Sequence, residues 1–453
     1  MTKQIESLTD MIAALAEGTQ TPLSLAERSL ERAAQRVDLN AFAALDEDIV
    51  MAQAEAANRR RLQGSALSAI DGISIAIKDN YLTKDYPTTA CSNARPLEPS
   101  GHDATIVANL RSAGAVIFGK TNMHEWAYGA TNTTSNIGPT RNPHNTNHIT
   151  GGSSGGSGAA VAGGIVPAAF GSDTGGSIRI PSSACGIYGF KPSYGRASRH
   201  GVLPLSWSLD APGPMATSLQ DIVHLLPFVL GADFADPSTA RARAFREVEP
   251  PKSVKVLNIS GAGLERSTEV DKTINDALSR TGATIAQGLL PDITQYFAAW
   301  ETILHSEASS YHQPLVATNP DGFSPVTRAH LEAGTRITAT ELLTAQKIRA
   351  RLMQALLNDL PDWDVLVLPT LPVAAPKHGD AWQEFGGRHV TTQDAMTWFC
   401  WLGNLAGLPC LTLPVGYSSA GLPIGMMLMG KPSGDEALLA AAKLFDQNIN
   451  NVG

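Results

Sequence analysis

Cysteine is scarce in this chain, which limits the kinds of scaffold that need to be considered. The sequence of 453 residues contains four cysteines, and no two of them form a C-x-x-C pair. With so few cysteines over this length, a scaffold held together by disulfides is not expected. The expected location is therefore a reducing compartment, the cytoplasm.

Long apolar runs are missing as well. No window approaches the roughly 18 consecutive apolar residues of a membrane span. The opening segment, MTKQIESLTDMIAAL, has no apolar stretch of the length found in signal peptides. The sequence thus predicts a soluble protein without a membrane partner.

Positive charge is in deficit. The chain has 34 Lys and Arg residues against 42 Asp and Glu, a formal net charge of −8. A surface that coats nucleic acid needs an excess of positive charge. We therefore expect a small-molecule substrate and no nucleic-acid partner.

Recognisable histidine motifs are lacking too. None of the eleven histidines stands in a known catalytic-triad motif. His144 and His148 lie in a polar segment, but no acidic residue or cysteine stands at a spacing that would complete a metal site. We expect neither a metal nor another cofactor.

The chain does have enough apolar residues for a large core. Hydrophobic residues make up 43% of the sequence and charged residues 17%. Over this length, such a composition supports one large domain or two closely joined ones.

The most informative stretch runs from Thr150 to Gly195 and contains two serines framed by glycines. Ser153 stands in the motif GGSSGG and Ser177 at the end of the motif DTGGS. Glycines beside a serine let the backbone turn sharply and approach a ligand closely. Consecutive backbone N–H groups in such a segment can converge on an anion, as acyl transfer requires around its nucleophile.

Three other interpretations of this stretch fit the sequence less well. A phosphate-binding loop would end in Gly-Lys-Ser or Gly-Lys-Thr, which is absent. The letters around Ser153 fit the G-x-S-x-G elbow of α/β-hydrolases, but the elbow follows a buried strand and residues 145–148 are polar. A flexible linker is disfavoured by the small apolar residues of 159–170, which should pack in a core. Ser153 is therefore not expected to be the nucleophile.

A candidate base stands upstream. The alternating segment ISIAI over 73–77 predicts a strand, and Lys78 follows at its end. An unactivated serine needs a base, and a buried lysine can serve because burial disfavours its charged form. Moving a lysine pKa from about 10.4 to near 7 costs roughly 4 kcal/mol, which enclosure in a core could supply.

These residues resemble the signature of the amidase signature family of serine amidohydrolases. The resemblance covers GISIAIKDN at 72–80, the glycine-serine stretch and GIYGFKP at 186–192, and extends over roughly 71–237. It implies a triad of Lys78, Ser153 and Ser177, with Ser177 as nucleophile and a cis peptide bond before Ser153. It also implies that the oxyanion is held by the backbone N–H groups of Thr174, Gly175, Gly176 and Ser177.

Further residues are predicted around this triad. Ser154, Asp173 and Arg179 are expected to support the catalytic loops, although an ordinary structural role explains them equally well. Candidates for the substrate pocket, by resemblance or by aromatic character, are Met123, Tyr128, Gly129, Trp207 and Trp401.

The resemblance implies an α/β fold in which helices flank both faces of a central mixed sheet. A single domain over 1–453 is expected, with N-terminal helices over 1–64, a catalytic core over 71–237, a variable helical region over 238–360 that shapes the pocket, and completing strands and helix over 361–453. A homodimer is also expected.

Two activities remain open. GPTRNP at 138–143 and DWD at 362–364 resemble carboxybiuret- and allophanate-type hydrolases, which favours a hydrolase of small amides, ureido compounds or carbamates, acting on C–N bonds other than peptide bonds. YGRASR at 194–199 resembles the glutaminase subunit of tRNA-dependent amidotransferases, but that subunit typically has glutamine where this chain has Ile180. A non-enzymatic relative is disfavoured because all three triad positions are present.

Overall fold

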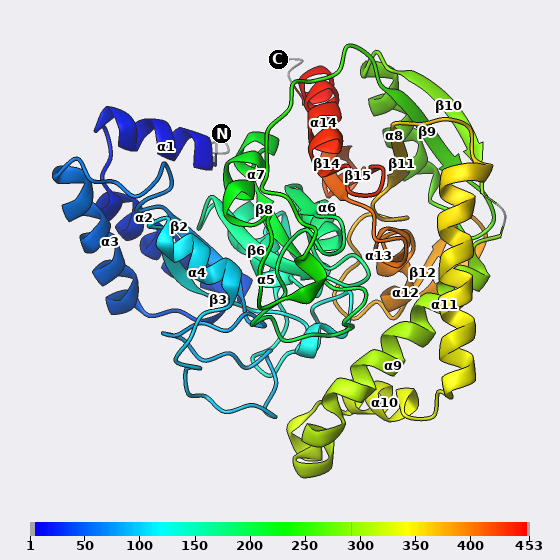
Figure 1. Ribbon diagram of the computed structural model, residues 1–453, viewed down its shortest axis with the longest axis horizontal. Coiled ribbons are helices and arrows are strands. Elements are labelled where there is room, and N and C mark those ends of the chain that lie inside the picture. Colours follow the sequence, from blue (N-terminus) through cyan, green and yellow to red (C-terminus); the bar gives the residue numbers. More distant parts are fainter. Residues whose placement is uncertain (1–4, 291, 451–453) are drawn as a thin grey trace.

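The computed structural model describes residues 5–290 and 292–450. Their centre is one mixed sheet of eleven strands, which crosses the molecule in Figure 1. From edge to edge its strands are β1 (Phe42–Ala44), β3 (Val116–Thr121), β2 (Ser74–Lys78), β6 (Ala168–Asp173), β8 (Ala211–Ala216), β7 (Tyr188–Lys191), β14 (Cys410–Tyr417), β15 (Pro423–Met429), β11 (Val365–Pro369), β9 (Lys255–Ser260) and β10 (Thr284–Leu289).

The direction of the strands changes across the sheet. Strands β3, β2 and β6 run parallel to one another, and so do β11, β9 and β10. The strands between these two groups pair antiparallel. Strands from the N-terminal, middle and C-terminal parts of the chain thus share one sheet, and the predicted α/β class with a mixed sheet is confirmed.

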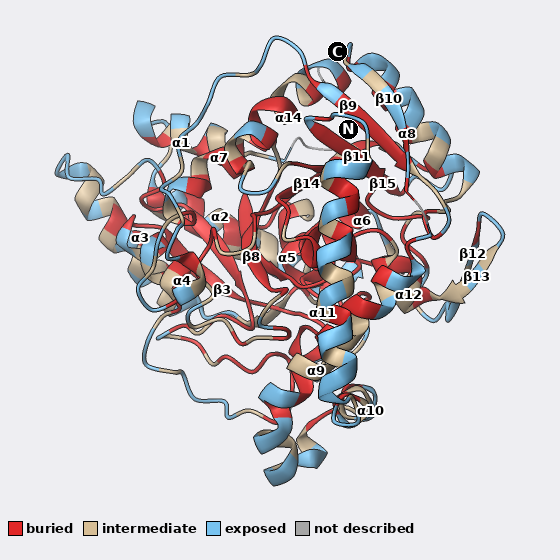
Figure 2. Ribbon diagram, turned by 45° about the vertical axis from the view of Figure 1, so that its right-hand side comes forward, coloured by how far each residue is buried: buried red, intermediate tan, exposed pale blue. Residues whose placement is uncertain are grey.

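Both faces of the sheet are buried. Successive side chains of a strand point to opposite faces, and every residue of strands β2 and β11 is buried. In β2, Ile75 and Ile77 belong to one hydrophobic core, whereas Ala76 belongs to the core of the other face. In β11, Val367 belongs to the same core as Ile75, whereas Leu366 belongs to a core on the other face. Figure 2 accordingly shows buried strands between helices whose outer sides are exposed.

Helices cover each face. Those that pack on the core of Ile75 are α1 (Leu8–Glu17), α4 (Thr105–Ser112), α7 (Leu219–Leu225), α8 (Thr268–Arg280) and α14 (Asp435–Asn450). Those on the other face are α3 (Glu47–Leu62), α5 (Gly155–Ala162), α6 (Arg179–Cys185), α9 (Thr294–Thr318), α10 (Pro325–Gly334), α11 (Ala339–Gln354), α12 (Thr392–Thr397) and α13 (Trp401–Leu405), while α2 (Pro22–Gln35) reaches both cores.

The glycine-serine stretch forms helix α5, strand β6, helix α6 and strand β7, and almost all residues of these elements are buried. Helix α5 packs so closely that a Cβ at Gly156 would lie 2.4 Å from the carbonyl oxygen of Asn122 and 2.5 Å from that of Ala41. The chain then enters β6 in the middle of the sheet and turns into α6 after Ser177. The expectation that residues 159–170 pack in a core is confirmed, since nearly all of them are buried.

Two local predictions differ from the structure. Residues 131–148 are dense in Asn, Thr, Pro and His, a composition that predicts a loop, but the segment ends in a two-stranded hairpin of β4 (Arg141–Asn142) and β5 (Asn145–Ile149). A strand therefore does precede Ser153, but it lies outside the main sheet and half of it is exposed. The aromatic-rich segment 398–408, which ends near Gly407, predicts one helix, but the structure forms the short α13 there, separated from α12 by residues 398–400.

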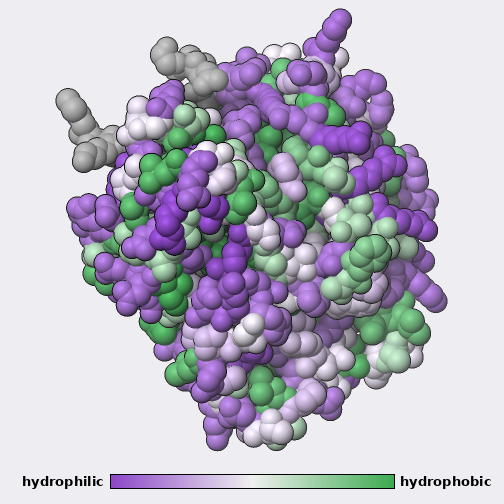
Figure 3. All heavy atoms as spheres, turned by 60° about the vertical axis from the view of Figure 1, so that its left-hand side comes forward, coloured by the Kyte–Doolittle hydropathy of each residue, from purple (hydrophilic) through white to green (hydrophobic). Residues whose placement is uncertain are grey.

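Hydrophilic side chains predominate on the face seen in Figure 3, with apolar side chains interspersed. A second hairpin, β12 (Trp382–Phe385) with β13 (Arg388–Thr391), extends from the body. Within 5–290 and 292–450, no helix combines the length and the apolar character required to cross a bilayer.

Candidate active site

The end of strand β2 carries a lysine that is enclosed in the protein. Lys78 is 0% exposed, and its Nζ donates hydrogen bonds to Ser153 Oγ at 2.7 Å and to Ser172 Oγ at 2.9 Å. The Ser172 hydroxyl also accepts a hydrogen bond from the Asn80 side-chain amide at 3.0 Å. The lysine predicted from the strand pattern thus contacts one of the two predicted serines directly.

The charge of this lysine is poorly solvated. Burial lowers the pKa of Lys78 to about 7, although the carboxylates of Asp173 and Asp210 oppose the shift. A substantial fraction of Lys78 is therefore neutral at physiological pH, as a base acting on a hydroxyl requires.

Two turns hold the serines next to each other. The peptide bond between Gly152 and Ser153 is cis, as the family resemblance implies. The Ser154 N–H donates to the carbonyl oxygen of Ser177 at 3.3 Å, which joins the two glycine-framed turns. Ser177 itself is 6% exposed and borders a cavity, whereas Ser153 is 0% exposed. The structure thus brings together all three residues of the predicted triad.

Asp173 organises the turn that carries Ser177. Its carboxylate accepts hydrogen bonds from the backbone N–H of Gly176 at 2.8 Å and of Ile178 at 3.1 Å. It also pairs with the Arg179 guanidinium at 2.8 Å, and both side chains are fully buried. Burial would raise the pKa of Asp173, but Arg179 and the Asn404 amide lower it to about 2. The carboxylate therefore stays ionised and fixes the loop.

The same contact alters the predicted set of oxyanion donors. Because the Gly176 N–H is directed at Asp173, it is already engaged within the loop. Thr174, Gly175 and Ser177 remain the expected donors. The Thr174 hydroxyl donates to Asp210 at 2.5 Å, and the Trp300 indole N–H donates to the Thr174 carbonyl at 3.2 Å, so this backbone is held from two sides.

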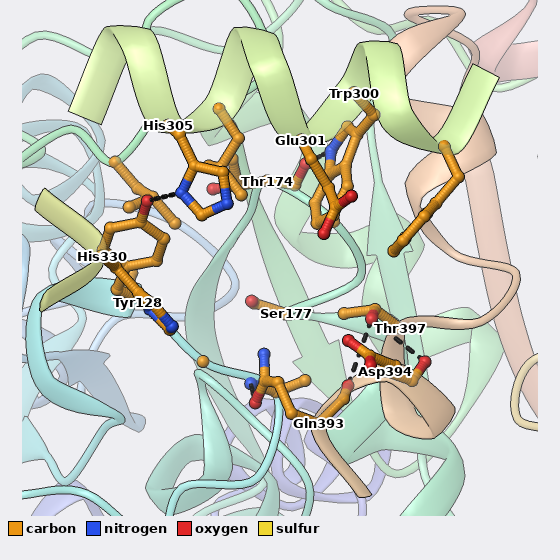
Figure 4. A pocket seen from close by; sticks show the side chains of 17 residues that line it. Tyr128, Thr174, Ser177, Trp300, Glu301, His305, His330, Gln393, Asp394 and Thr397 are labelled. Carbon is orange, nitrogen blue, oxygen red and sulfur yellow. Dashed lines mark hydrogen bonds between the residues drawn. The ribbon is translucent and has the colours of Figure 1, made fainter. Parts of the chain in front are cut away.

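A cavity of about 110 Å³ opens in front of Ser177. In Figure 4, Ser177 lies between α9, which supplies Trp300, Glu301 and His305, and the α12 region, which supplies Asp394. The cavity is lined by Ala127, Tyr128, Gly129, Ala130, Thr174, Gly175, Ser177, Leu205, Phe297, Trp300, Glu301, Leu304, His305, His330, Gln393, Asp394 and Thr397.

The predicted pocket residues separate into three groups. Tyr128 and Gly129 line the cavity. Met123 and Trp401 are packed in the hydrophobic core instead, and Trp401 reaches the cavity only through edge contact with Phe297. Trp207 is 64% exposed and stacks with Arg199 at a different depression of the surface. Aromatic character alone could not distinguish lining side chains from core or surface ones.

Sequence reasoning missed the polar residues of the cavity wall. Glu301 and His305 come from α9, His330 from α10, and Gln393 and Asp394 from α12. These elements lie far apart in the chain and carry no motif. The only available signal was the expectation that residues 238–360 shape the pocket.

The titratable groups of this wall are partly buried. Burial raises the pKa of Glu301 to about 7, and the negative charge of Asp394 adds to the shift. Burial lowers the pKa of His305 to about 4, with a contribution from His330. The Tyr128 hydroxyl is hydrogen-bonded to His305 Nδ1. His305 is therefore neutral near pH 7.

The two histidines considered as metal ligands face backbone groups. His144 Nε2 lies 3.0 Å from the carbonyl oxygen of Cys185, and His148 Nδ1 lies 2.7 Å from that of Ala375. Each ring is thus held by a backbone carbonyl.

Comparisons with known proteins agree with this geometry. The family model Amidase matches residues 24–439. The chain is 34% identical over 490 residues to the A subunit of glutamyl-tRNA(Gln) amidotransferase of Cupriavidus necator, covering 98% of this chain and 96% of that protein. It is equally 34% identical over 450 residues to the AtzE subunit of 1-carboxybiuret hydrolase of Pseudomonas sp., covering 96% and 97%.

Solved structures show the same architecture. One of them superposes with a TM-score of 0.91 at 32% identity, covering 98% of this chain and 99% of the other. It comes from a study of a vestigial protein complex that reveals the evolutionary origins of an s-triazine catabolic enzyme. Another, described as an amidase, has a TM-score of 0.87 at 33% identity, covering 97% and 98%. These matches establish that the chain belongs to the amidase signature family and is an amidohydrolase.

Proposed function

We propose that this protein hydrolyses a C–N bond of a small amide, ureido or carbamate substrate through an acyl-enzyme on Ser177. The observation that carries the proposal is the buried contact of 2.7 Å between Lys78 Nζ and Ser153 Oγ, beside a serine that borders a cavity. A neutral amine in that place can accept the proton that a serine nucleophile must lose.

Acylation follows from this relay. Ser177 Oγ attacks the substrate carbonyl carbon and transfers its proton to Ser153 Oγ, while the Ser153 proton moves to Lys78 Nζ. The backbone N–H groups of Thr174, Gly175 and Ser177 stabilise the oxyanion, and loss of one such donor costs about 3 kcal/mol in typical cases. Asp173 and Arg179 act by holding these donors in position.

The C–N bond then breaks with the proton returning along the same path. Lys78 gives its proton back to Ser153, and Ser153 protonates the departing nitrogen, which makes it an amine instead of an unstable amide anion. Water then attacks the acyl-enzyme, and the same residues remove its proton. The relay therefore acts as a base when the nucleophile attacks and as an acid when the nitrogen departs.

The cavity favours a small acyl group. Its volume of about 110 Å³ is well below the roughly 300–1,000 Å³ of sites that accept drug-sized ligands. Phe297 and Trp300 give it an aromatic side, stacked at 5.5 Å between ring centroids. A compact amide or ureido compound fits this enclosure better than a peptide chain.

A glutaminase subunit is the second candidate, because relatives named as components of glutamyl-tRNA(Gln) amidotransferase match at the same 34% identity as the carboxybiuret hydrolase component. Ile180 speaks against it. The Ile180 side chain is 0% exposed and packs against the glycine turns, where a Cβ at Gly151 or Gly176 would meet it at 2.7 and 2.6 Å. It offers no polar contact to a glutamine substrate.

The test is release of ammonia or amine by the purified protein alone, with aliphatic and aryl amides, an aryl carbamate, biuret-like ureas and glutamine as substrates. We expect turnover of a small amide or ureido class that Ser177→Ala abolishes and the exposed-site control Ser419→Ala retains. Activity with glutamine alone that needs added partner proteins would favour the second candidate. Activity that survives Ser177→Ala would refute the assignment of the nucleophile.

A further inference from the structure

Two carboxyl groups face each other across the cavity of Ser177. Glu301 extends from α9 and Asp394 from α12, on opposite sides of the space in front of the serine (Figure 4). Both side chains are half-buried. The proximity of the two groups is reflected in the effect of Asp394, whose charge helps to raise the pKa of Glu301.

Neither carboxyl group has an ion-pair partner in the described part of the chain. Among residues 5–290 and 292–450, no ion pair includes Glu301 or Asp394, and no Lys or Arg lines the cavity. His305 and His330 are the basic side chains of the cavity wall, and burial lowers the pKa of each, although the charge of Asp394 opposes this shift at His330. Lys377 borders only the adjoining cavity, which Asp394 also lines. A cationic group that enters this half-enclosed site would therefore meet carboxyl groups that form no ion pair with the protein.

An aromatic wall stands beside the carboxyl groups. Trp300 precedes Glu301 in α9, and its indole ring lines the same cavity together with Phe297. A carboxylate combined with an aromatic face is a chemistry that attracts alkylammonium groups, by charge and by the cation–π effect. An anionic substrate group would meet repulsion from both carboxyl groups instead.

We propose that Glu301 and Asp394 form a subsite for a primary ammonium group, so that the preferred substrates are small amides carrying an amine at the end remote from the scissile bond. This inference rests on the proposed hydrolysis at Ser177 and names its substrate class. The amine enters the space between α9 and α12 while the carbonyl carbon faces Ser177.

The test compares three amides of matched length: 4-aminobutanamide, which is cationic, pentanamide, which is neutral, and glutaramate, which is anionic. We expect kcat/KM to be at least about tenfold higher for the cationic amide than for the neutral one, as hydrogen bonds to charged groups typically provide. Glu301→Gln and Asp394→Asn should each reduce this ratio severalfold. Asp276→Asn, an exposed change on α8, should leave the ratio and the activity unchanged.

A binding measurement separates this inference from the proposed hydrolysis. Calorimetric titration of the Ser177→Ala protein with n-propylammonium and with n-propanol needs no turnover. If the ammonium binds more tightly than the alcohol and Glu301→Gln weakens its binding, the subsite is supported, even where the wild-type protein hydrolyses no amide. A wild-type protein that hydrolyses none of the amides would refute the proposed hydrolysis but not the subsite. Equal binding of both probes, or a wild-type enzyme that prefers pentanamide or glutaramate, would overturn the subsite.

Discussion

In the proposed mechanism, the protonation state of a single buried amine sets the pH range of activity. Lys78 must be neutral to accept a proton through Ser153, and burial lowers its pKa to about 7. Below that pH the ammonium form predominates and cannot act as a base. We therefore expect kcat/KM to fall by about tenfold for each pH unit below 7 and to level off above it. A pH–rate profile with a neutral amide measures this limb.

Glu301 titrates in the same range, so the profile needs a control. Burial raises the pKa of Glu301 to about 7, and Glu301→Gln removes that titration. We expect the acid limb to persist in Glu301→Gln, because it belongs to Lys78. An acid limb that disappears in this variant would assign the pH dependence to the carboxyl group instead.

Single residues were predictable where a motif carries them. Lys78, Ser153 and Ser177 stand in segments whose glycines and strand pattern are specific, and the structure brings them together. Glu301, His305 and Asp394 could not be found in this way, because ordinary helical positions become part of a cavity only through the packing of α9 and α12. Gly176 shows a further limit, since the direction of its N–H depends on the Asp173 carboxylate.

At the scale of elements, helix α5 depends on close backbone contact. A Cβ at Gly156 would collide with two carbonyl oxygens, which cannot move away as the end of a flexible side chain can. We expect Gly156→Ala to destabilise the protein by about 3 kcal/mol or more, as severe overpacking does. Thermal denaturation measures the loss.

Gly64 provides the comparison for this variant. It has a φ of +67° and nothing within 4 Å of its Cβ position, so Gly64→Ala incurs backbone strain without a collision. That strain costs about 1–2 kcal/mol. If Gly64→Ala lowers the melting temperature as much as Gly156→Ala does, close packing of α5 is not the cause.

Element boundaries were predictable where local chemistry sets them. A capping side chain at Thr21, followed by Pro22, and another at Ser218 predict helix starts, and in the structure each side chain accepts a hydrogen bond from the first turn that follows. The hairpin of β4 and β5 was missed because its residues are polar, and its pairing depends on contacts such as that between the Ile149 N–H and the Pro376 carbonyl. The interruption between α12 and α13 carries no glycine or proline, so composition gave no sign of it.

At the scale of the whole molecule, stability and catalysis can be separated. Helix α1 buries Leu8 and Met11 in the core on the face of α7, and no residue of α1 lines the cavity. We expect Leu8→Ala and Met11→Ala each to cost about 2–5 kcal/mol of the free energy of unfolding. Activity per folded molecule should not change. Chemical denaturation with active-site titration checks both, and a fall in kcat at full folding would contradict the separation.

The overall fold was predictable mainly through the family resemblance. Composition indicated only a large core, and the alternating helices and strands agreed with an α/β class. The order of the eleven strands depends on pairings between distant segments, such as β6 with β8 and β7 with β14. Such pairings leave no trace in the local sequence. The expected homodimer and the expected location in the cytoplasm stay predictions.

The burial of the four cysteines makes the protein suitable for labelling at a single introduced cysteine. All four are buried, and burial raises the pKa of each thiol, that of Cys400 to about 12. Maleimides and other thiol labels react with exposed thiolates, so the native protein should take up little label. One cysteine introduced on the outer side of α8, as in Asp276→Cys, would then be the site of attachment for a dye or spin probe, without removal of any native cysteine.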